Sequence, residues 1–316
     1  MSDNFKDKKE QEALSYLEKN FVSDNNDLES IQKVDVSYLN TVPSNEYIHI
    51  PLNILPCGLF YKQGTKISIR AAKVQEVQAY SVVDDNNYLD ITEKMNGILT
   101  SCVRFFHSSG IQGSYKDLRD GDRLFLIFMI RELTFPGGKN LSKDVTCPCG
   151  NEFKMELRAT SSDKVQKSFV NFEMPAKLEK FFDEQERVFV FKIDGVDYKL
   201  APPTIGIQEI FFGDIASKIK LEKTPNVSFL KLASFMLYNS NKITDDGIKA
   251  KEQEFKRMDM NTFQILNHAV SQMTFGIKEM KNNCPACGME VHTDMSFPSG
   301  ASNIFVVQDA IDKYFG

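Results

Sequence analysis

The spacing of apolar residues predicts strands at the start of the ordered part of the chain. Ile48, Ile50 and Leu52 alternate with other residues, which is typical of a half-buried strand. The segments Phe60–Tyr61 and Lys66–Arg70 also have the composition of strands, and Gly64 lies between them. A small β-structure is therefore expected to begin near residue 47.

Two helices are expected next. Lys73–Val83 carries apolar residues at helical spacing, and a second helix, capped by Asp90 or Thr92, is expected to reach about Phe106. The later run Leu124–Ile130 is apolar throughout. A short run of this kind fits a buried strand as well as a buried helix, so periodicity alone does not decide between them.

The second part of the chain begins with a clear hairpin pattern. Phe189–Leu200 is a strand-like run interrupted by Asp194–Gly195, a dipeptide that favours a tight two-residue turn. Thr262–Met273 has its apolar residues at helical spacing, Met289–Met295 predicts a strand, and Asn303–Tyr314 predicts a short closing helix.

Short segments recur in the same order in the two parts of the chain, which predicts an internal duplication. The offset between partners drifts only slightly along the sequence, and the repeated order makes both apolar runs, Leu124–Ile130 and Thr262–Met273, more typical of helices. The five matched pairs are Gly64 with Gly195, Val74–Val77 with Ile207–Ile210, Leu99–Ser101 with Leu232–Ser234, Thr134–Phe135 with Thr274–Phe275, and Cys149–Gly150 with Cys287–Gly288.

The expected fold class is α+β, with two duplicated halves. Each half is expected to contain a small β-hairpin and helices and to end in a cysteine knuckle, and the two knuckles are expected to share one zinc-ribbon-like site. The predicted division is a flexible N-terminal arm (1–45), a first half (46–160), a Phe-rich connector (161–186), a second half (187–298) and a C-terminal helix (299–316).

Two cysteine pairs carry the candidate chemistry. Cys147 and Cys149 form a C-x-C-G turn, and Cys284 and Cys287 form a C-x-x-C-G turn. The glycine allows a tight knuckle that points both sulfurs of a pair to the same side, and four thiolates complete a tetrahedral Zn²⁺ site. These four cysteines are therefore the predicted ligands of a structural zinc ion. Bound iron and a site that has lost its metal are the alternatives.

The remaining cysteines and histidines have no ligand pattern. Cys57 and Cys102 lie among apolar residues and are expected to be buried. His292 follows the second pair closely and is a candidate substitute ligand, although with four thiols present it is expected on the exposed face of its strand.

Composition and charge exclude several functions. The net charge of −5 and the absence of a basic stripe argue against nucleic-acid binding, and phosphate-binding, hydrolase and metalloprotease motifs are missing. The N-terminal residues lack the apolar core of a secretory signal, and the longest apolar run has seven residues (124–130), too short to span a membrane. A cytosolic, non-enzymatic protein with reduced thiols is expected.

One segment carries a family resemblance. Ile50–Tyr61, with the strand and the Gln75–Glu76 helix that follow, resembles baseplate hub and hub-assembly proteins of T-even-type contractile-tailed phages. The resemblance continues through Gly121–Leu124 and Thr134–Phe135 and covers about the first half of the chain. It implies a protein without enzymatic activity that binds other hub or tape-measure proteins in the host cytoplasm, or in the tail baseplate of the virion.

Two roles are compatible with this resemblance, a permanent hub component and an assembly chaperone that leaves the finished tail. The main alternative is a zinc-ribbon module that binds nucleic acid, which the acidic charge balance disfavours. An enzyme with a structural zinc is the third hypothesis.

Overall fold

A computed structural model describes most of the chain between residues 47 and 305. The predicted arm (1–45) and most of the predicted C-terminal helix lie outside the described residues. The described ranges are 47–135, 141–157, 169–220, 227–236, 245–277, 280–293 and 301–305.

The first half contains an antiparallel sheet of three strands in the order β1-β2-β3. The strand β1 (Ile48–Ile50) pairs with β2 (Lys66–Ile69). The sequence predicted a strand at both places, although Leu52 lies beyond the end of β1. The other neighbour of β2 is β3 (Val103–Phe106), whose inward residues Val103 and Phe105 are buried against the helices.

Three helices pack with this sheet: α2 (Val74–Tyr80), α3 (Tyr88–Cys102) and α4 (Arg123–Thr134). The side-chain oxygen of Asn87 accepts hydrogen bonds from the first turn of α3. The prediction of a helix capped by Asp90 or Thr92 and reaching Phe106 is therefore wrong at both ends. Pairing of Val103–Phe106 with β2 overrides the local helical pattern, because it buries β-branched and aromatic side chains in the core.

Phe60–Tyr61 is not a strand. The chain makes two successive 3-10 turns here, and a Cβ atom at Gly58 would lie 1.7 Å from the Leu52 carbonyl oxygen, so the backbone doubles back too tightly for an extended segment. The 3-10 helices are η2 (Leu52–Ile54), η3 (Gly58–Phe60), η4 (Tyr115–Asp117), η5 (Asp120–Asp122), η6 (Glu179–Phe181) and η7 (Ala301–Phe305).

The helix α4 is the centre of the first half, and the ambiguous apolar run 124–130 is indeed helical. Its side chains at Phe125, Leu126, Ile127 and Phe128 are all at most 1% exposed. A helix that is apolar on every side must be covered on every side. The surrounding cover comes from α3, from β10 and from the C-terminal η7.

The second half begins with a sheet in the order β7-β8-β9, made of β7 (Phe182–Asp183), β8 (Val188–Ile193) and β9 (Val196–Leu200). The predicted turn joins β8 to β9, with positive φ at Asp194 (50°) and Gly195 (79°). Four helices follow: α5 (Ile205–Lys220), α6 (Val227–Met236), α7 (Asp245–Arg257) and α8 (Met260–Gln272).

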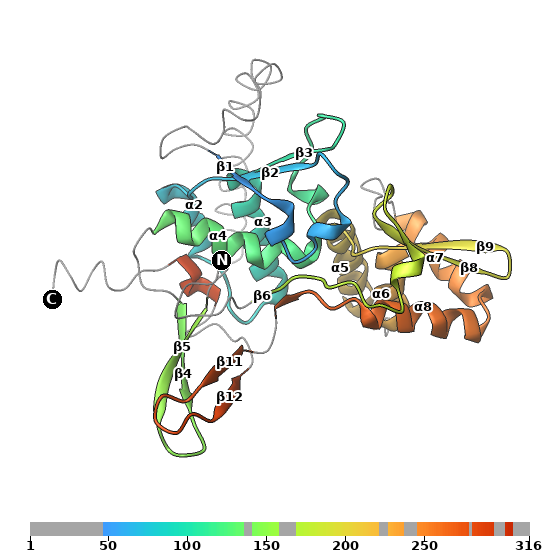
Figure 1. The fold of residues 1–316 in the computed structure, drawn as a ribbon. Coiled ribbons are helices and arrows are strands. Elements are labelled where there is room, and N and C mark those ends of the chain that lie inside the picture. The colour runs from blue at the N-terminus through green and yellow to red at the C-terminus, as the bar shows by residue number, and fades with distance from the viewer. Residues whose placement is uncertain are drawn as a thin grey trace.

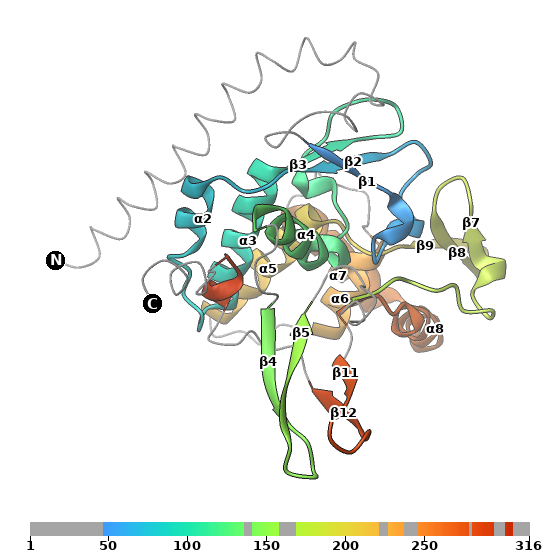
Figure 2. The ribbon, with the colours of Figure 1, turned by 60° about the vertical axis from the view of Figure 1, so that its left-hand side comes forward.

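Each half ends in a two-stranded hairpin that extends from the body of the molecule (Figure 1). The first consists of β4 (Leu141–Thr146) and β5 (Glu152–Leu157), and the second of β11 (Met280–Asn283) and β12 (Glu290–Thr293). The views in Figures 1 and 2 agree that the two hairpins lie side by side.

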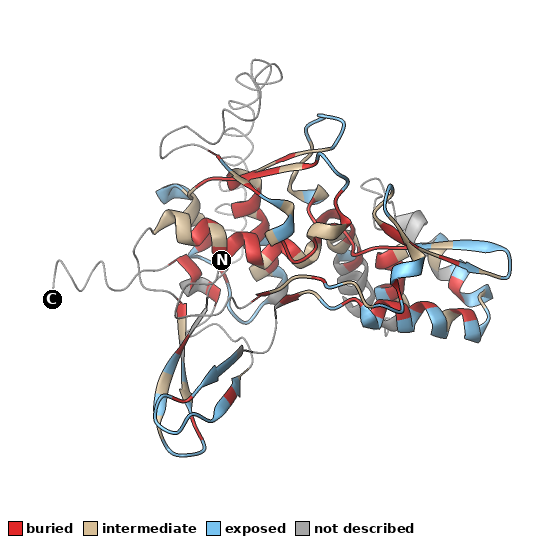
Figure 3. Cartoon of the chain, in the orientation of Figure 1, coloured by how far each residue is buried: buried red, intermediate tan, exposed pale blue. Residues whose placement is uncertain are grey.

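The two halves have separate hydrophobic cores, and residues of one half also belong to the core of the other. Buried segments are present in both halves (Figure 3). Cys57 and Phe60 of the first half belong to the core of the second, where Phe60 packs against Phe172 and Phe189. The connector contributes to both cores, since Phe169 packs on Phe125 of α4. The short strand β6 (Phe169–Val170) that carries Phe169 pairs with β10 (Gly276–Ile277) after α8.

The closing segment η7 returns to the first half. Ala301, Ile304 and Phe305 are at most 2% exposed, and the Phe305 ring meets the Tyr80 ring of α2 edge-on at 5.1 Å. The side chains of Tyr80 and Arg131 donate hydrogen bonds to the carbonyls of Ala301 and Ile304.

The chain is thus a mixed α+β protein, as predicted. None of the helices in the described ranges combines the length and the apolar character that crossing a bilayer requires.

Candidate metal centre

The four predicted ligands lie at the tips of the two hairpins. Cys147 follows the last residue of β4 and Cys284 follows the last residue of β11, so strand pairing holds the start of each knuckle. The register closes each hairpin just before its knuckle, through the pairs Thr146 with Glu152 and Asn283 with Glu290.

The two knuckles have the same backbone plan. In the first, the Cys147 N–H donates to the Asn151 carbonyl at 2.9 Å, and in the second, the Cys284 N–H donates to the Met289 carbonyl at 2.8 Å. The intervening Gly150 and Gly288 have φ of 87° and 73°, in the left-handed region that favours glycine. The glycine after each cysteine pair is therefore required by the turn, as the motif predicted.

The structure brings the four sulfurs into one cluster, all within 4.8 Å of one another. The Cys147 and Cys287 Sγ atoms are 3.6 Å apart, and those of Cys149 and Cys284 are 3.8 Å apart. Four sulfurs about 2.3 Å from a central ion lie about 3.8 Å apart in a tetrahedron. The cluster therefore has dimensions that fit a tetrahedrally bound metal ion.

Burial differs within each pair. Cys147 and Cys284 are buried, whereas Cys149 and Cys287 are exposed. Each short sulfur contact joins a buried cysteine of one hairpin to an exposed cysteine of the other.

The electrostatics of the cluster favour a thiolate at one position. Burial raises the pKa of the Cys284 thiol, but hydrogen bonds from the backbone of Cys287 and Ala286 outweigh burial and lower that pKa to about 6. The backbone of Cys149 lowers the pKa of Cys147, yet burial and hydrogen bonds with the other thiols raise it to about 12. Four thiolates this close repel one another, so a cation is the natural partner of the fully deprotonated cluster.

The other candidate residues lie elsewhere. Cys57 and Cys102 are 0% exposed, in the cores of the second and first half, as expected. His292 is exposed, as predicted, and its Nε2 lies 2.8 Å from the Glu290 carboxylate rather than in the sulfur cluster.

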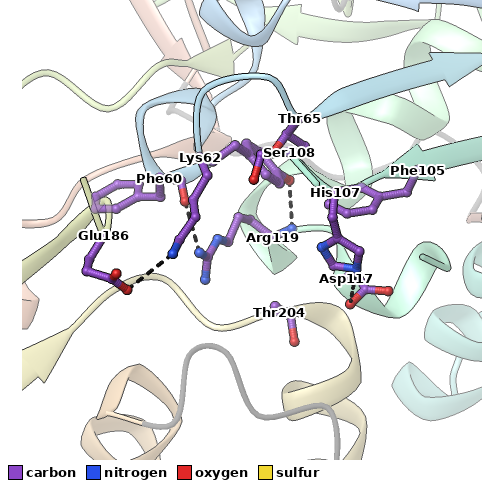
Figure 4. Close-up of a pocket in the computed structure, with 11 residues that line it drawn as sticks. Phe60, Lys62, Thr65, Phe105, His107, Ser108, Asp117, Arg119, Glu186 and Thr204 are labelled. Atoms are coloured by element: carbon purple, nitrogen blue, oxygen red, sulfur yellow. Dashed lines mark hydrogen bonds and ion pairs between the residues drawn. The ribbon is translucent and has the colours of Figure 1, made fainter. Parts of the chain in front are cut away.

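A pocket of about 260 Å³ opens at the junction of the halves, and sequence reasoning did not find it (Figure 4). His107 and Asp117 approach to 3.6 Å on one side of it, and Lys62 and Glu186 to 3.3 Å on the other. These pairs join residues far apart in sequence or on different elements, and no sequence motif marks them.

The guanidinium of Arg119 lies between these pairs (Figure 4). It donates to the Phe60 carbonyl at 2.9 Å and to the Pro202 carbonyl of the second half at 2.6 Å. Two pairs of oppositely charged residue types thus lie in the lining, and Arg119 bridges the two halves. The pocket is thus explained as part of the junction, and we assign it no ligand.

A buried carboxylate contacts Tyr61, which lines the pocket. Asp122 is 0% exposed and accepts hydrogen bonds from the Tyr61 hydroxyl at 2.6 Å and from the Cys57 backbone N–H at 2.7 Å. Burial raises its pKa to about 7, although these donors and the nearby Arg119 oppose the shift. The sequence alone did not indicate this group, because its environment is built from segments about 60 residues apart.

Comparison of the chain with protein-family models, with curated proteins and with solved structures found no match. The function must therefore be argued from the residues and from the geometry of the site.

Proposed function

We propose that the four thiolates hold one structural zinc ion and that the chain is a non-enzymatic protein acting through protein–protein contacts. The observation that carries the proposal is the cluster of Cys147, Cys149, Cys284 and Cys287, with all sulfurs within 4.8 Å. A centre with four protein thiolates has no open coordination position, which suits a structural role and not a catalytic one. Zinc is preferred over iron because it is the usual ion of closed four-cysteine knuckles.

The zinc would join two parts of the chain that are distant in sequence. Cys149 and Cys284 are 135 residues apart, so a bond network through one ion closes a long loop. Closing a long loop restricts the unfolded chain, and the binding free energy adds to the folding free energy.

The metal content tests the first part of the proposal. Elemental analysis of the purified protein is expected to find one zinc per chain, and a Cys284→Ser, Cys287→Ser double variant is expected to lose it. A wild-type protein without a stoichiometric metal would refute the zinc centre. Stoichiometric iron would support a four-cysteine metal site but would show that its ion is iron and not zinc.

We infer further that the two halves arose by duplication. The inference is supported by the content of the two halves, since each contains a three-stranded antiparallel sheet and several helices and ends in a hairpin with a cysteine knuckle. The parallel is incomplete, because β3 follows α3 in the first half, whereas the second half has the additional helix α7.

For the biological role, we propose a baseplate hub component or hub-assembly chaperone of a contractile-tailed phage, present in the host cytoplasm during assembly. The support is the resemblance of Ile50–Tyr61 and the segments after it. The proposed zinc centre, which would hold the two hairpins together, suits a protein with a structural role. The expected partners are other hub proteins or the tape-measure protein.

Affinity capture from infected cells tests this role. A tagged chain is expected to recover hub or tape-measure proteins, and mass spectrometry of finished tails would separate a retained component from a chaperone that leaves. Recovery of no tail protein would refute the role. A salt-dependent gel shift with DNA or RNA would favour the alternative of a zinc-ribbon nucleic-acid-binding module.

A further inference from the structure

The side chain of Asn151 connects the two knuckles directly. Asn151 follows Gly150 in the first knuckle, and its amide Nδ2 lies 3.6 Å from the Sγ atom of Cys284 in the second. A sulfur acceptor allows a longer hydrogen bond than oxygen does, and a thiolate is a stronger acceptor than a thiol. The amide therefore donates from one hairpin to a buried sulfur of the other.

The backbone of the same residue holds its own knuckle. The Asn151 carbonyl accepts the Cys147 N–H at 2.9 Å, so the position of the Asn151 side chain is tied to that of a ligand in the first hairpin. One residue thus contacts Cys147 through its main chain and Cys284 through its side chain.

The matching position in the second knuckle has no side-chain hydrogen-bond donor. Met289 also follows the knuckle glycine, and its carbonyl accepts the Cys284 N–H at 2.8 Å. Its thioether side chain has no N–H to donate, and the residue is 50% exposed. The backbone plan of the two knuckles is the same, and the side chain at this position differs.

We propose that Asn151 is a positioning residue of the metal centre, which orients the Cys284 thiolate toward the ion and reduces the negative charge on its sulfur. The inference depends on the zinc centre proposed above. Groups of this kind beside a metal ligand typically change metal affinity 10- to 100-fold when they are removed.

The test compares matched variants at the two positions. Asn151→Leu removes the amide donor at similar size, and Asn151→Asp replaces it with a carboxylate that repels the thiolate. Met289→Leu is the control at the matching position. Zinc affinity is measured by competition with a chromogenic chelator, with circular dichroism to verify folding.

We expect Asn151→Leu to bind zinc about 10- to 100-fold more weakly than wild type, Asn151→Asp more weakly still, and Met289→Leu like wild type. Cobalt-loaded protein gives a second readout. Loss of a hydrogen bond raises the energy of the sulfur electrons, so the sulfur-to-cobalt charge-transfer band is expected to move to longer wavelength in Asn151→Leu and in Asn151→Asp, but not in Met289→Leu.

The possible failures are distinct. If the wild type binds no metal, both the zinc centre and the role of Asn151 are refuted. If the wild type binds zinc and the three variants match it in affinity and in the cobalt spectrum, Asn151 has no positioning role and the zinc centre stands. Should Asn151→Leu fold poorly, the nearly isosteric Asn151→Asp decides the question by the same two measurements.

Discussion

Asp122 illustrates what a single residue contributes to the junction between the halves. Its carboxylate receives donors from Tyr61 and Cys57, while the neighbouring Arg119 reaches Pro202 of the second half. The backbone continues the connection, since the Asp120 N–H donates to the Pro203 carbonyl at 2.9 Å. A fully buried acid of this kind favours its neutral form, so the junction is sensitive to proton binding.

The pH dependence of stability is expected to reflect Asp122. Its pKa is about 7 in the folded protein and about 3.9 in an unfolded chain, so the folded state binds the extra proton between these values. The contribution of this group to the free energy of unfolding is therefore largest below pH 4 and falls as the pH rises to 7, by an amount on the order of 4 kcal/mol.

The variant Asp122→Asn cannot ionise, so it is expected to gain stability relative to wild type as the pH is raised from 5 to 8. Urea unfolding at both pH values measures the difference. Asp197→Asn, at an exposed position of β9, is the control for the removal of one carboxylate from the surface. A parallel profile for Asp122→Asn would contradict the assignment.

At the scale of elements, the closing segment η7 is held by two helices of the first half. The Tyr80 hydroxyl of α2 donates to the Ala301 carbonyl at 2.9 Å, and Arg131 of α4 donates to the Ile304 carbonyl. Phe305 is 2% exposed and lies in the same core as α4. A segment that follows the second half thus completes the cover of the first.

Truncation of the Phe305 side chain is expected to destabilise the folded protein. Phe305→Ala should lower the free energy of unfolding by about 3–5 kcal/mol, because a buried aromatic ring is removed and a cavity remains. Val82→Ala, at a residue that is 71% exposed, should change it by less than about 0.5 kcal/mol. Denaturant unfolding distinguishes the two, and equal small effects would show that η7 adds little to the core.

At the scale of the whole molecule, the hairpins and the cores are stabilised differently. The cores are rich in buried aromatic and aliphatic side chains and include α4 and β8. The hairpins extend from the body with exposed residues on both strands, as Figure 3 shows. Isolated two-stranded hairpins are only marginally stable, so the proposed zinc ion should matter most there.

Chelation of the metal is therefore expected to act locally. Hydrogen exchange should accelerate in β4–β5 and β11–β12 when zinc is removed, while α4 and β8 stay protected because their cores are intact. The double cysteine variant provides the metal-free reference. Loss of protection throughout the chain would instead mean that the metal supports the entire fold. Unchanged hydrogen-exchange rates in the two hairpins would mean that the metal does not hold them together.

Much of the local structure and the membership of the four-cysteine cluster followed from the sequence. Turn chemistry placed the Asp194–Gly195 hairpin, cysteine spacing identified all four members of the sulfur cluster, and helical periodicity placed α8. The turn, the helix and each cysteine pair depend on residues within a few positions of one another, so a linear pattern is enough to predict them. The meeting of the two cysteine pairs was inferred because together they supply the four thiolates of a closed site.

Tertiary contacts decided the rest. Val103–Phe106 is a strand because β2 lies beside it, although the preceding helical pattern continues into it. The contact from Asn151 to Cys284 joins residues 133 positions apart, and the burial of Asp122 comes from segments about 60 residues away. The sequence by itself determined which residues were suited to a strand, a helix or a metal, because that preference is local. Only the folded chain decided which of them meet, because the free energy of burial and pairing belongs to contacts between distant residues.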